Sequence, residues 1–200
     1  MKKTLLICLC VLGFCVNAQS FTDKPLQQSV LQLNNAKTAS DYDILFKKFS
    51  ESKTTEKWQA YYYAAVSMYL KTESLIKKGN PSTLTGSNAL ASKFAMGALG
   101  NSHSNDEIEI LLGLIHLQKV ALNASANTQK DITAASDLIV KLESTSVNNP
   151  RLSLLRARMA QYAKKTGEAE NFYKQASAEF STAGSSNTVP TWGSTLISNK

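Results

Sequence analysis

Residues 58–76 read WQAYYYAAVSMYLKTESLI, and they predict one long helix. Their aromatic and other core-forming side chains recur every three or four residues, which is the period of an α-helix. These positions are Trp58, Tyr61, Tyr62, Ala65, Tyr69, Thr72 and Ile76. Such a stripe must pack against neighbouring elements, because buried aromatic rings contribute much of the stability of a core. We expect the helix to run from about Thr55 to Lys78 and to end at Gly79-Asn80-Pro81.

The helical period continues on both sides of this stretch, and strand-like alternation is absent over any useful length. Further helices are expected at about residues 23–33, 40–49, 87–99, 105–123, 129–142, 149–162 and 166–180. The segment 105–123 carries two apolar stripes, so it should pack on more than one side and lie centrally. The predicted fold class is all-α, built as roughly four stacked helical hairpins.

Three parts of the chain are expected: a signal peptide over residues 1–18, one helical domain over 19–183 and an irregular tail over 184–200. From Ser181 onward the composition turns to serine, threonine, glycine and proline. Within this tail, we expect Trp192 to pack against the helical domain and so hold the tail to it.

The N-terminus has the pattern of an export signal. Lys2 and Lys3 precede an apolar run over residues 4–16, and Val16-Asn17-Ala18 supplies the small residues that precede cleavage. The run is too short for a membrane-spanning helix, which favours cleavage after Ala18 over a retained anchor. No cysteine follows a small residue, as a lipidated cysteine would. We therefore expect a periplasmic or secreted protein that is not an integral membrane protein.

Export also changes the composition of the chain. All three cysteines, Cys8, Cys10 and Cys15, lie in the segment predicted to be removed, so the mature chain should contain no disulfide. Loss of Lys2 and Lys3 lowers the formal net charge from +7 to +5. The remaining cations are spread along the chain in isolated pairs, which is typical of solvated helices. Nucleic acid is therefore not an expected partner.

The residues that carry chemistry are few. The chain has two histidines, His103 in a polar loop and His116 on the predicted central helix. A transition-metal site would lack its usual ligand set, so we expect no metal and no cofactor. There is no nucleophile-elbow sequence and no glycine-rich phosphate loop. The sequence therefore favours a non-enzymatic protein, with His116 as a partly buried, hydrogen-bonded imidazole.

Four residues are candidates for partner binding. Tyr63 falls off the apolar stripe of its helix, which makes it the best candidate for an exposed recognition aromatic. We expect the helices that carry Tyr63 and His116 to line one binding groove. Arg151 and Arg158 are seven residues apart on one helix face and could contact an anion, although solvated surface is the favoured interpretation.

Short motifs resemble the tetratricopeptide repeat. Ala169, Tyr173 and Ala176 match the alanine–aromatic–alanine spacing of its second helix, and Leu112-Gly113 resembles its first-helix pattern. A longer resemblance, to small exported tetratricopeptide-like proteins of certain Gram-negative bacteria, spans most of residues 55–193. It is carried by Trp58 with Tyr61-Tyr62-Tyr63-Ala64-Ala65, Glu109 with Leu112-Gly113, Asn149-Pro150-Arg151, and Pro190-x-Trp192-Gly193. The resemblance implies degenerate helical repeats and no catalytic residues.

Stacked hairpins leave a curved groove suited to an extended peptide or a partner helix. The first functional hypothesis is thus a protein- or peptide-binding adaptor in the bacterial cell envelope. The alternative is a carrier of a small molecule or lipid that uses an apolar cavity between helices. A hydrolase of envelope polymers is a third possibility that no motif supports. The identity of the partner and the oligomeric state stay open at this stage.

Overall fold

The structure is a computed structural model, and it describes residues 21–76, 78, 84–102, 104–183 and 190–197. The predicted signal peptide, the Gly79-Asn80-Pro81 turn and His103 lie outside the described residues. Within these ranges the chain forms eight α-helices and one short 3₁₀ turn, and no strand occurs there. The all-α prediction is confirmed.

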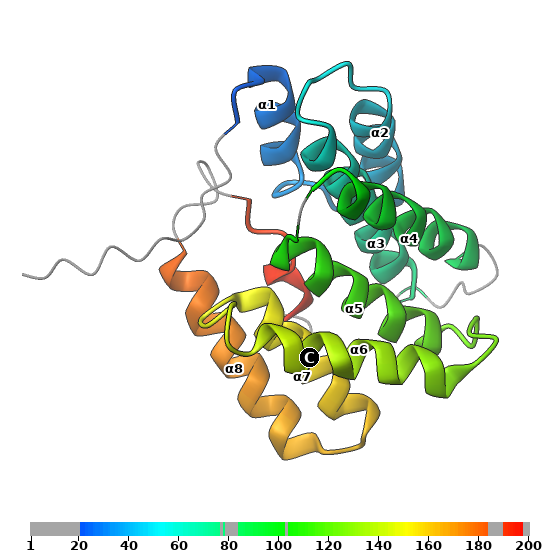
Figure 1. Cartoon of the computed structure of the whole chain (residues 1–200), viewed down its shortest axis with the longest axis vertical. Coiled ribbons are helices and arrows are strands. Elements are labelled where there is room, and N and C mark those ends of the chain that lie inside the picture. Colours follow the sequence, from blue (N-terminus) through cyan, green and yellow to red (C-terminus); the bar gives the residue numbers. More distant parts are fainter. Residues whose placement is uncertain (1–20, 77, 79–83, 103, 184–189, 198–200) are drawn as a thin grey trace, which may run out of the picture.

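The helices follow one another as antiparallel neighbours. They are α1 (Lys24–Gln32), α2 (Ala39–Ser50), α3 (Lys57–Ile76), α4 (Leu84–Gly100), α5 (Asp106–Ala121), α6 (Thr128–Leu142), α7 (Pro150–Tyr162), α8 (Thr166–Thr182) and the 3₁₀ turn η1 (Ser194–Leu196). Successive helices pack as the hairpins α1–α2, α3–α4, α5–α6 and α7–α8. Figure 1 shows these four hairpins stacked in chain order, with α5 in the middle. The expectation of roughly four hairpins is confirmed.

Local sequence explains where several helices begin. The Asp23 carboxylate accepts a hydrogen bond from the Leu26 backbone N–H at 2.9 Å, with Pro25 in the first turn of α1. Thr38 and Asp41 form a reciprocal capping box at the start of α2. At α7 the Asn149 side chain caps the first turn and Pro150 occupies the first helical position. These polar residues bond backbone groups that a helix end leaves without partners.

The core passes through α3 and α5. Most of α3 is buried, because α2, α4 and α5 surround it. The backbone of α5 approaches α7 closely at Gly113, where a Cβ atom would lie 2.7 Å from Leu155 Cδ2. A side chain at position 113 would clash with Leu155 unless Leu155 moved, and glycine avoids this clash. The predicted central position of the 105–123 helix is therefore confirmed.

The chain returns to the domain after α8. Trp192 is 3% exposed, and Leu196 of η1 is 7% exposed. Trp192 thus anchors the described part of the C-terminal segment, as the sequence predicted. None of the helices in the described ranges combines the length and the apolar character needed to cross a membrane.

Candidate functional site

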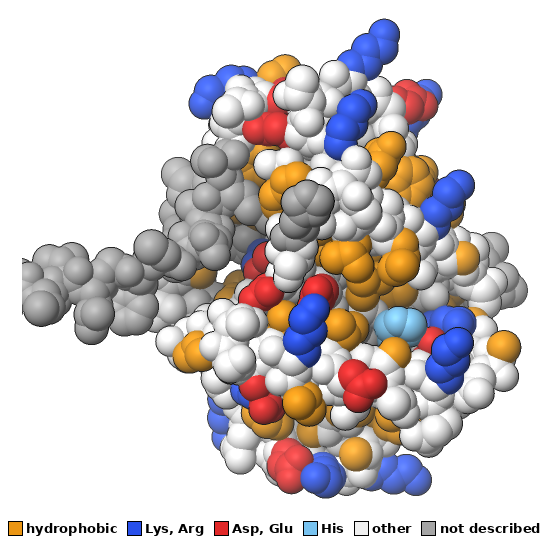
Figure 2. Space-filling view, viewed as in Figure 1, with side chains coloured by type: hydrophobic (Ala, Val, Ile, Leu, Met, Phe, Trp, Pro, Cys, Tyr) orange, Lys and Arg blue, Asp and Glu red, His pale blue; other side chains and the backbone are white. Residues whose placement is uncertain are grey.

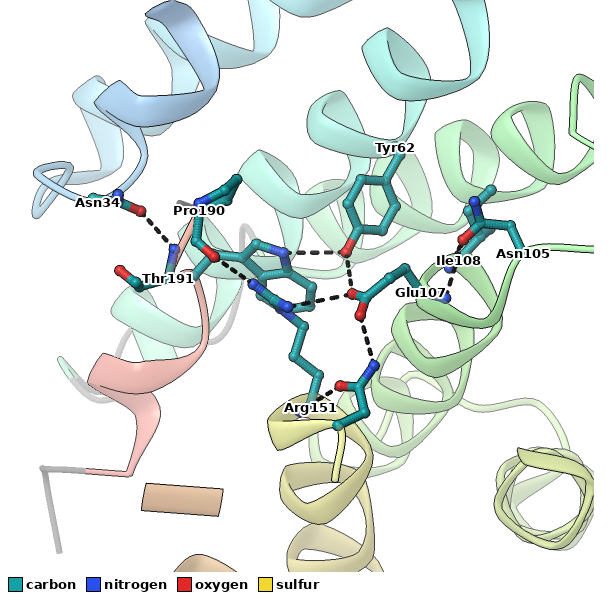
Figure 3. Close-up of polar contacts among 10 residues, drawn as sticks. Asn34, Tyr62, Asn105, Glu107, Ile108, Arg151, Pro190 and Thr191 are labelled. Atoms are coloured by element: carbon teal, nitrogen blue, oxygen red, sulfur yellow. Dashed lines mark hydrogen bonds and ion pairs between the residues drawn. The ribbon is translucent and has the colours of Figure 1, made fainter. Parts of the chain in front are cut away.

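A buried polar network holds the C-terminal segment in place (Figure 3). Tyr62 Oη donates to Glu107 Oε2 at 3.0 Å and accepts from Trp192 Nε1 at 3.1 Å. The Asn149 side chain donates to the other Glu107 oxygen at 2.7 Å. Arg151 lies 3.5 Å from Glu107 through Nη1. The network therefore joins α3, α5, the start of α7 and the C-terminal segment.

Arg151 is the link between this network and the segment that contains Trp192. Its Nη2 donates to the Pro190 carbonyl at 2.8 Å, and its guanidinium lies 4.6 Å from the Trp192 ring centroid. Burial acts to lower the pKa of Arg151, but Glu107 and the nearby tyrosines together outweigh burial and raise this pKa. Just after α1, the Asn34 side chain accepts a hydrogen bond from the Thr191 backbone N–H at 2.9 Å. These bonds are internal, so the network has a structural role.

A second polar network joins α3, α4, α5 and α7. Arg158 Nη2 lies 2.8 Å from Glu73 Oε2, and Gln118 Nε2 donates to Glu73 Oε1 at 2.8 Å. Gln118 in turn accepts from the Asn88 side chain at 3.0 Å. Four helices therefore share one hydrogen-bonded chain, which fixes their relative positions.

The third cluster lies at the surface, where α5 meets α6. His116 Nδ1 lies 2.7 Å from Asp131 Oδ1, and the Asp131 side chain is 8% exposed. Ser125 Oγ donates to Asp131 Oδ2 at 2.5 Å, and Lys119 Nζ lies 3.2 Å from that same oxygen. Burial alone would raise the pKa of the Asp131 carboxyl, but hydrogen bonds from Ser125, His116 and Lys119 outweigh burial and lower the pKa. Asp131 is therefore an anion that orients the His116 ring.

An apolar area borders His116 on one side. Leu112, one turn before His116 on α5, is 7% exposed and belongs to the core, and Leu138, two turns after Asp131 on α6, is partly buried against it. Asn88 of α4 donates to the Ile115 carbonyl at 3.2 Å, which joins α4 to α5. Met96 lies two turns after Asn88 on α4 and is 56% exposed. We call the exposed apolar surface of α4 and α5, which includes Met96 and has His116 at its edge, the α5 strip. Figure 2 shows apolar atoms gathered over α4 and α5, with the described histidine at their edge.

A shallow pocket lies elsewhere, between α1 and α2. Its volume is about 210 Å³, and Gln32, Asp41 and Ile44 are among its lining residues. Pockets that enclose a drug-sized ligand are larger, at about 300–1,000 Å³. Its lining also mixes polar and apolar side chains.

The structure corrects the prediction for Tyr63. Its side chain is 1% exposed, with ring centroids 5.7 Å from Phe49 and 6.0 Å from Phe21. Burial raises the pKa of its phenol. The expectation of an exposed aromatic is wrong, because α3 is covered on the side opposite its stripe as well. A helical period identifies one buried face but does not show that a second face is also covered.

The two arginines also differ from the prediction of solvated surface. The Arg151 side chain is 12% exposed and the Arg158 side chain is 26% exposed. Each does contact an anion, but the anions are Glu107 and Glu73 of the same chain. His116 is hydrogen-bonded and partly buried, with 32% of its side chain exposed, as the sequence predicted. Asp131 was missed, because its pairing with His116 crosses from α5 to α6.

Comparisons with known proteins bear on the fold. The sequence matches no known protein-family profile, and no curated protein matches it significantly. Among solved structures, the chain is similar to the HusA haemophore from Porphyromonas gingivalis, with a TM-score of 0.68 and 20% sequence identity. The match covers 86% of this chain and 87% of that chain. At this identity the likeness establishes a shared helical fold, and it leaves the tetratricopeptide assignment unconfirmed.

Proposed function

We propose that the protein is a non-enzymatic, exported carrier of a small planar apolar molecule of the tetrapyrrole class. The observation that carries the proposal is the fold shared with a haemophore over 86% of the chain. This likeness favours the carrier hypothesis over the protein-binding adaptor.

The α5 strip is the proposed binding surface. It combines exposed apolar atoms with a hydrogen-bonded histidine, and apolar surfaces with a few placed polar groups are typical of small-molecule sites. Lys119 and Lys141 lie beside it, with 38% and 57% of their side chains exposed. Lys119 is paired with Asp131 at 3.2 Å and Lys141 with Glu109 at 2.6 Å, so the carboxylates of a natural porphyrin would share these lysines with the acids, while the ring packs on Met96.

The adaptor of the tetratricopeptide type is the second candidate. Val140 on α6 and Val147 in the following loop are each 68% exposed, so they offer apolar contacts to a partner protein. Exposed valines are common on soluble proteins, however, and they are weaker support than a fold match over most of the chain.

Titration of the purified protein with iron-free protoporphyrin IX tests the carrier proposal. We expect saturable one-to-one binding, measured by porphyrin absorbance and by quenching of tryptophan fluorescence. Met96→Asp should weaken binding at least about tenfold, because the porphyrin would desolvate a carboxylate.

Tyr162→Asp is the matched control, because Tyr162 is 49% exposed and lies on α7, outside the strip. This variant should bind protoporphyrin as the unmodified protein does. Absence of saturable binding to the unmodified protein would overturn the carrier proposal. Equal affinities of the Met96→Asp and Tyr162→Asp variants would show that the α5 strip is not the binding surface.

A further inference from the structure

The C-terminal segment, described over residues 190–197, is held by side chains of the first and last hairpins. Asn34, just after α1, accepts a hydrogen bond of 2.9 Å from the Thr191 backbone N–H. Arg151 of α7 donates to the Pro190 carbonyl at 2.8 Å. Figure 3 shows these two side chains on either side of the segment. The backbone of the segment is thus bound as peptide-binding proteins bind the main chain of an extended ligand.

One side chain of the segment is its anchor. Trp192 is 3% exposed, its Nε1 donates to Tyr62 Oη at 3.1 Å, and the Arg151 guanidinium lies 4.6 Å from its ring centroid. The ring of Tyr69 contacts it edge to face, with centroids 6.3 Å apart. A buried tryptophan with its N–H bonded is a frequent main anchor of protein interfaces. We call the surface formed by Asn34, Tyr62, Tyr69 and Arg151 the Trp192 site.

The segment leaves one donor of Arg151 unused. Nη2 bonds to the Pro190 carbonyl and Nη1 lies 3.5 Å from Glu107, whereas the buried Nε has no hydrogen-bond partner among the described residues. Nε and Nη2 lie along one edge of the planar guanidinium, and a carboxylate can accept from both at once. A carboxylate in place of the neutral Pro190 carbonyl would therefore bind Arg151 more strongly.

Covalent linkage favours the chain's own segment over a copy of it. A tethered segment binds as if its concentration were on the order of millimolar. The identical segment of a second copy makes the same contacts without this advantage, so it does not displace the first. A competing segment must form an additional bond, and Arg151 Nε is the position where the Trp192 site offers one.

From these observations we infer that the Trp192 site is a peptide-binding site, occupied in this structure by the chain's own C-terminal segment. The partner that fits it is a different protein with an extended segment that contains a tryptophan and, two positions earlier, an acidic side chain. The tryptophan takes the place of Trp192, and the carboxylate accepts hydrogen bonds from Nη2 and Nε of Arg151. This inference goes beyond the carrier proposal, which concerns the α5 strip.

Synthetic octapeptides that copy residues 190–197 test the inference. The first contains Pro190→Glu, the second contains Pro190→Gln as the neutral control, and the third contains Pro190→Glu with Trp192→Ala. Each is titrated into the isotope-labelled protein while nuclear magnetic resonance follows the indole N–H signals of Trp58 and Trp192. We expect the glutamate peptide to bind at least about tenfold more tightly than either control peptide. The Trp192 signal should move to the position of a solvated indole, while the Trp58 signal stays in place.

Two protein variants sharpen the test. Trp192→Phe keeps a ring in the site but removes the donor to Tyr62, so the chain's own segment is held less tightly. The glutamate peptide should therefore bind this variant about tenfold more tightly than it binds the unmodified protein. Trp58→Phe is the matched control and should leave the peptide affinity unchanged, because Trp58 is not part of the site.

The outcomes separate this inference from the carrier proposal. If no peptide binds the Trp192→Phe variant, or if the glutamate and glutamine peptides bind it equally, the peptide site is overturned. Peptide binding that leaves the Trp192 signal in place would also overturn it. Dimers that form by exchange of C-terminal segments, measured by sedimentation, would show that a second copy is the occupant and overturn the assignment to a different protein. Porphyrin titration decides the carrier proposal independently of these results.

Discussion

Trp192 Nε1 donates a hydrogen bond of 3.1 Å to Tyr62 Oη, which joins two residues 130 positions apart in the chain. Tyr62 Oη in turn donates to Glu107, so one hydroxyl links the C-terminal segment, α3 and α5. The guanidinium of Arg151 lies over the Trp192 ring and completes the contact. The C-terminal segment is therefore an integral part of the fold.

Replacement of Trp192 should destabilise the domain, and the loss should be larger for alanine than for phenylalanine. Trp192→Phe keeps a ring but removes the donor to Tyr62, which we expect to cost about 1–3 kcal/mol. Trp192→Ala also leaves a cavity, and the expected cost rises to about 3–5 kcal/mol. Urea unfolding followed by circular dichroism measures both values. Trp58→Phe is the control, because Trp58 is only partly buried; a loss as large as that of Trp192→Phe would contradict the role given to the hydrogen bond.

The Glu73–Arg158 pair should be strongly coupled. The Glu73 side chain is 9% exposed and Arg158 is 26% exposed, so removal of either partner leaves a poorly hydrated charge. We expect Arg158→Leu to cost about 3 kcal/mol, and Glu73→Gln combined with Arg158→Leu to cost less than the sum of the single changes. A double-mutant cycle from chemical denaturation measures this coupling. Strict additivity would show that the two charges do not interact.

Gly113 should not tolerate a side chain. Gly113→Ala would place a Cβ 2.7 Å from a methyl group of Leu155, which is fully buried and has little room to move. The expected cost is about 1–3 kcal/mol, because overpacking forces side chains and backbone apart. Gly86→Ala on α4 is the matched control, because nothing lies within 4 Å of its added Cβ. It should instead be neutral or stabilise by up to about 1 kcal/mol through helix propensity. Equal thermal midpoints for the two variants would refute the close contact.

The domain should lose stability in alkali. Burial raises the pKa of Tyr62, Tyr63 and Tyr69 above the usual value of 10.0. A raised pKa in the folded state means that the unfolded chain loses these protons first as the pH rises. The contribution to stability is therefore complete below about pH 10 and declines as the pH rises further.

Urea midpoints measured between pH 8 and pH 11 test this expectation. Tyr63→Phe should show a shallower alkaline decline than the unmodified protein, because one buried phenol no longer titrates. Tyr162→Phe is the control, because the side chain of Tyr162 is 49% exposed. A decline of the same slope in the unmodified protein and in Tyr63→Phe would mean that the buried phenol of Tyr63 does not contribute.

The helical architecture could be predicted from the sequence, because its causes are local. The three- and four-residue period of residues 58–76 depends only on neighbours within a few turns, as do the caps at Asp23 and Asn149. The predicted helix positions agree with the structure to within a few residues at most ends. Trp192 could also be chosen as an anchor, because a large aromatic in a polar tail gains most from burial.

The polar partners of the site were determined by tertiary structure. His116 could be recognised as a partly buried imidazole, but its orientation depends on Asp131, which reaches it from another helix. Tyr63 and Arg151 were assigned to the surface, and they are buried because segments far apart in the chain close over them. A helical period shows which side of a helix is apolar, whereas the number of its sides that become covered depends on how the other hairpins stack. For that physical reason the sequence alone indicated the helices and their order, and only the packed hairpins revealed which charged and aromatic groups are enclosed.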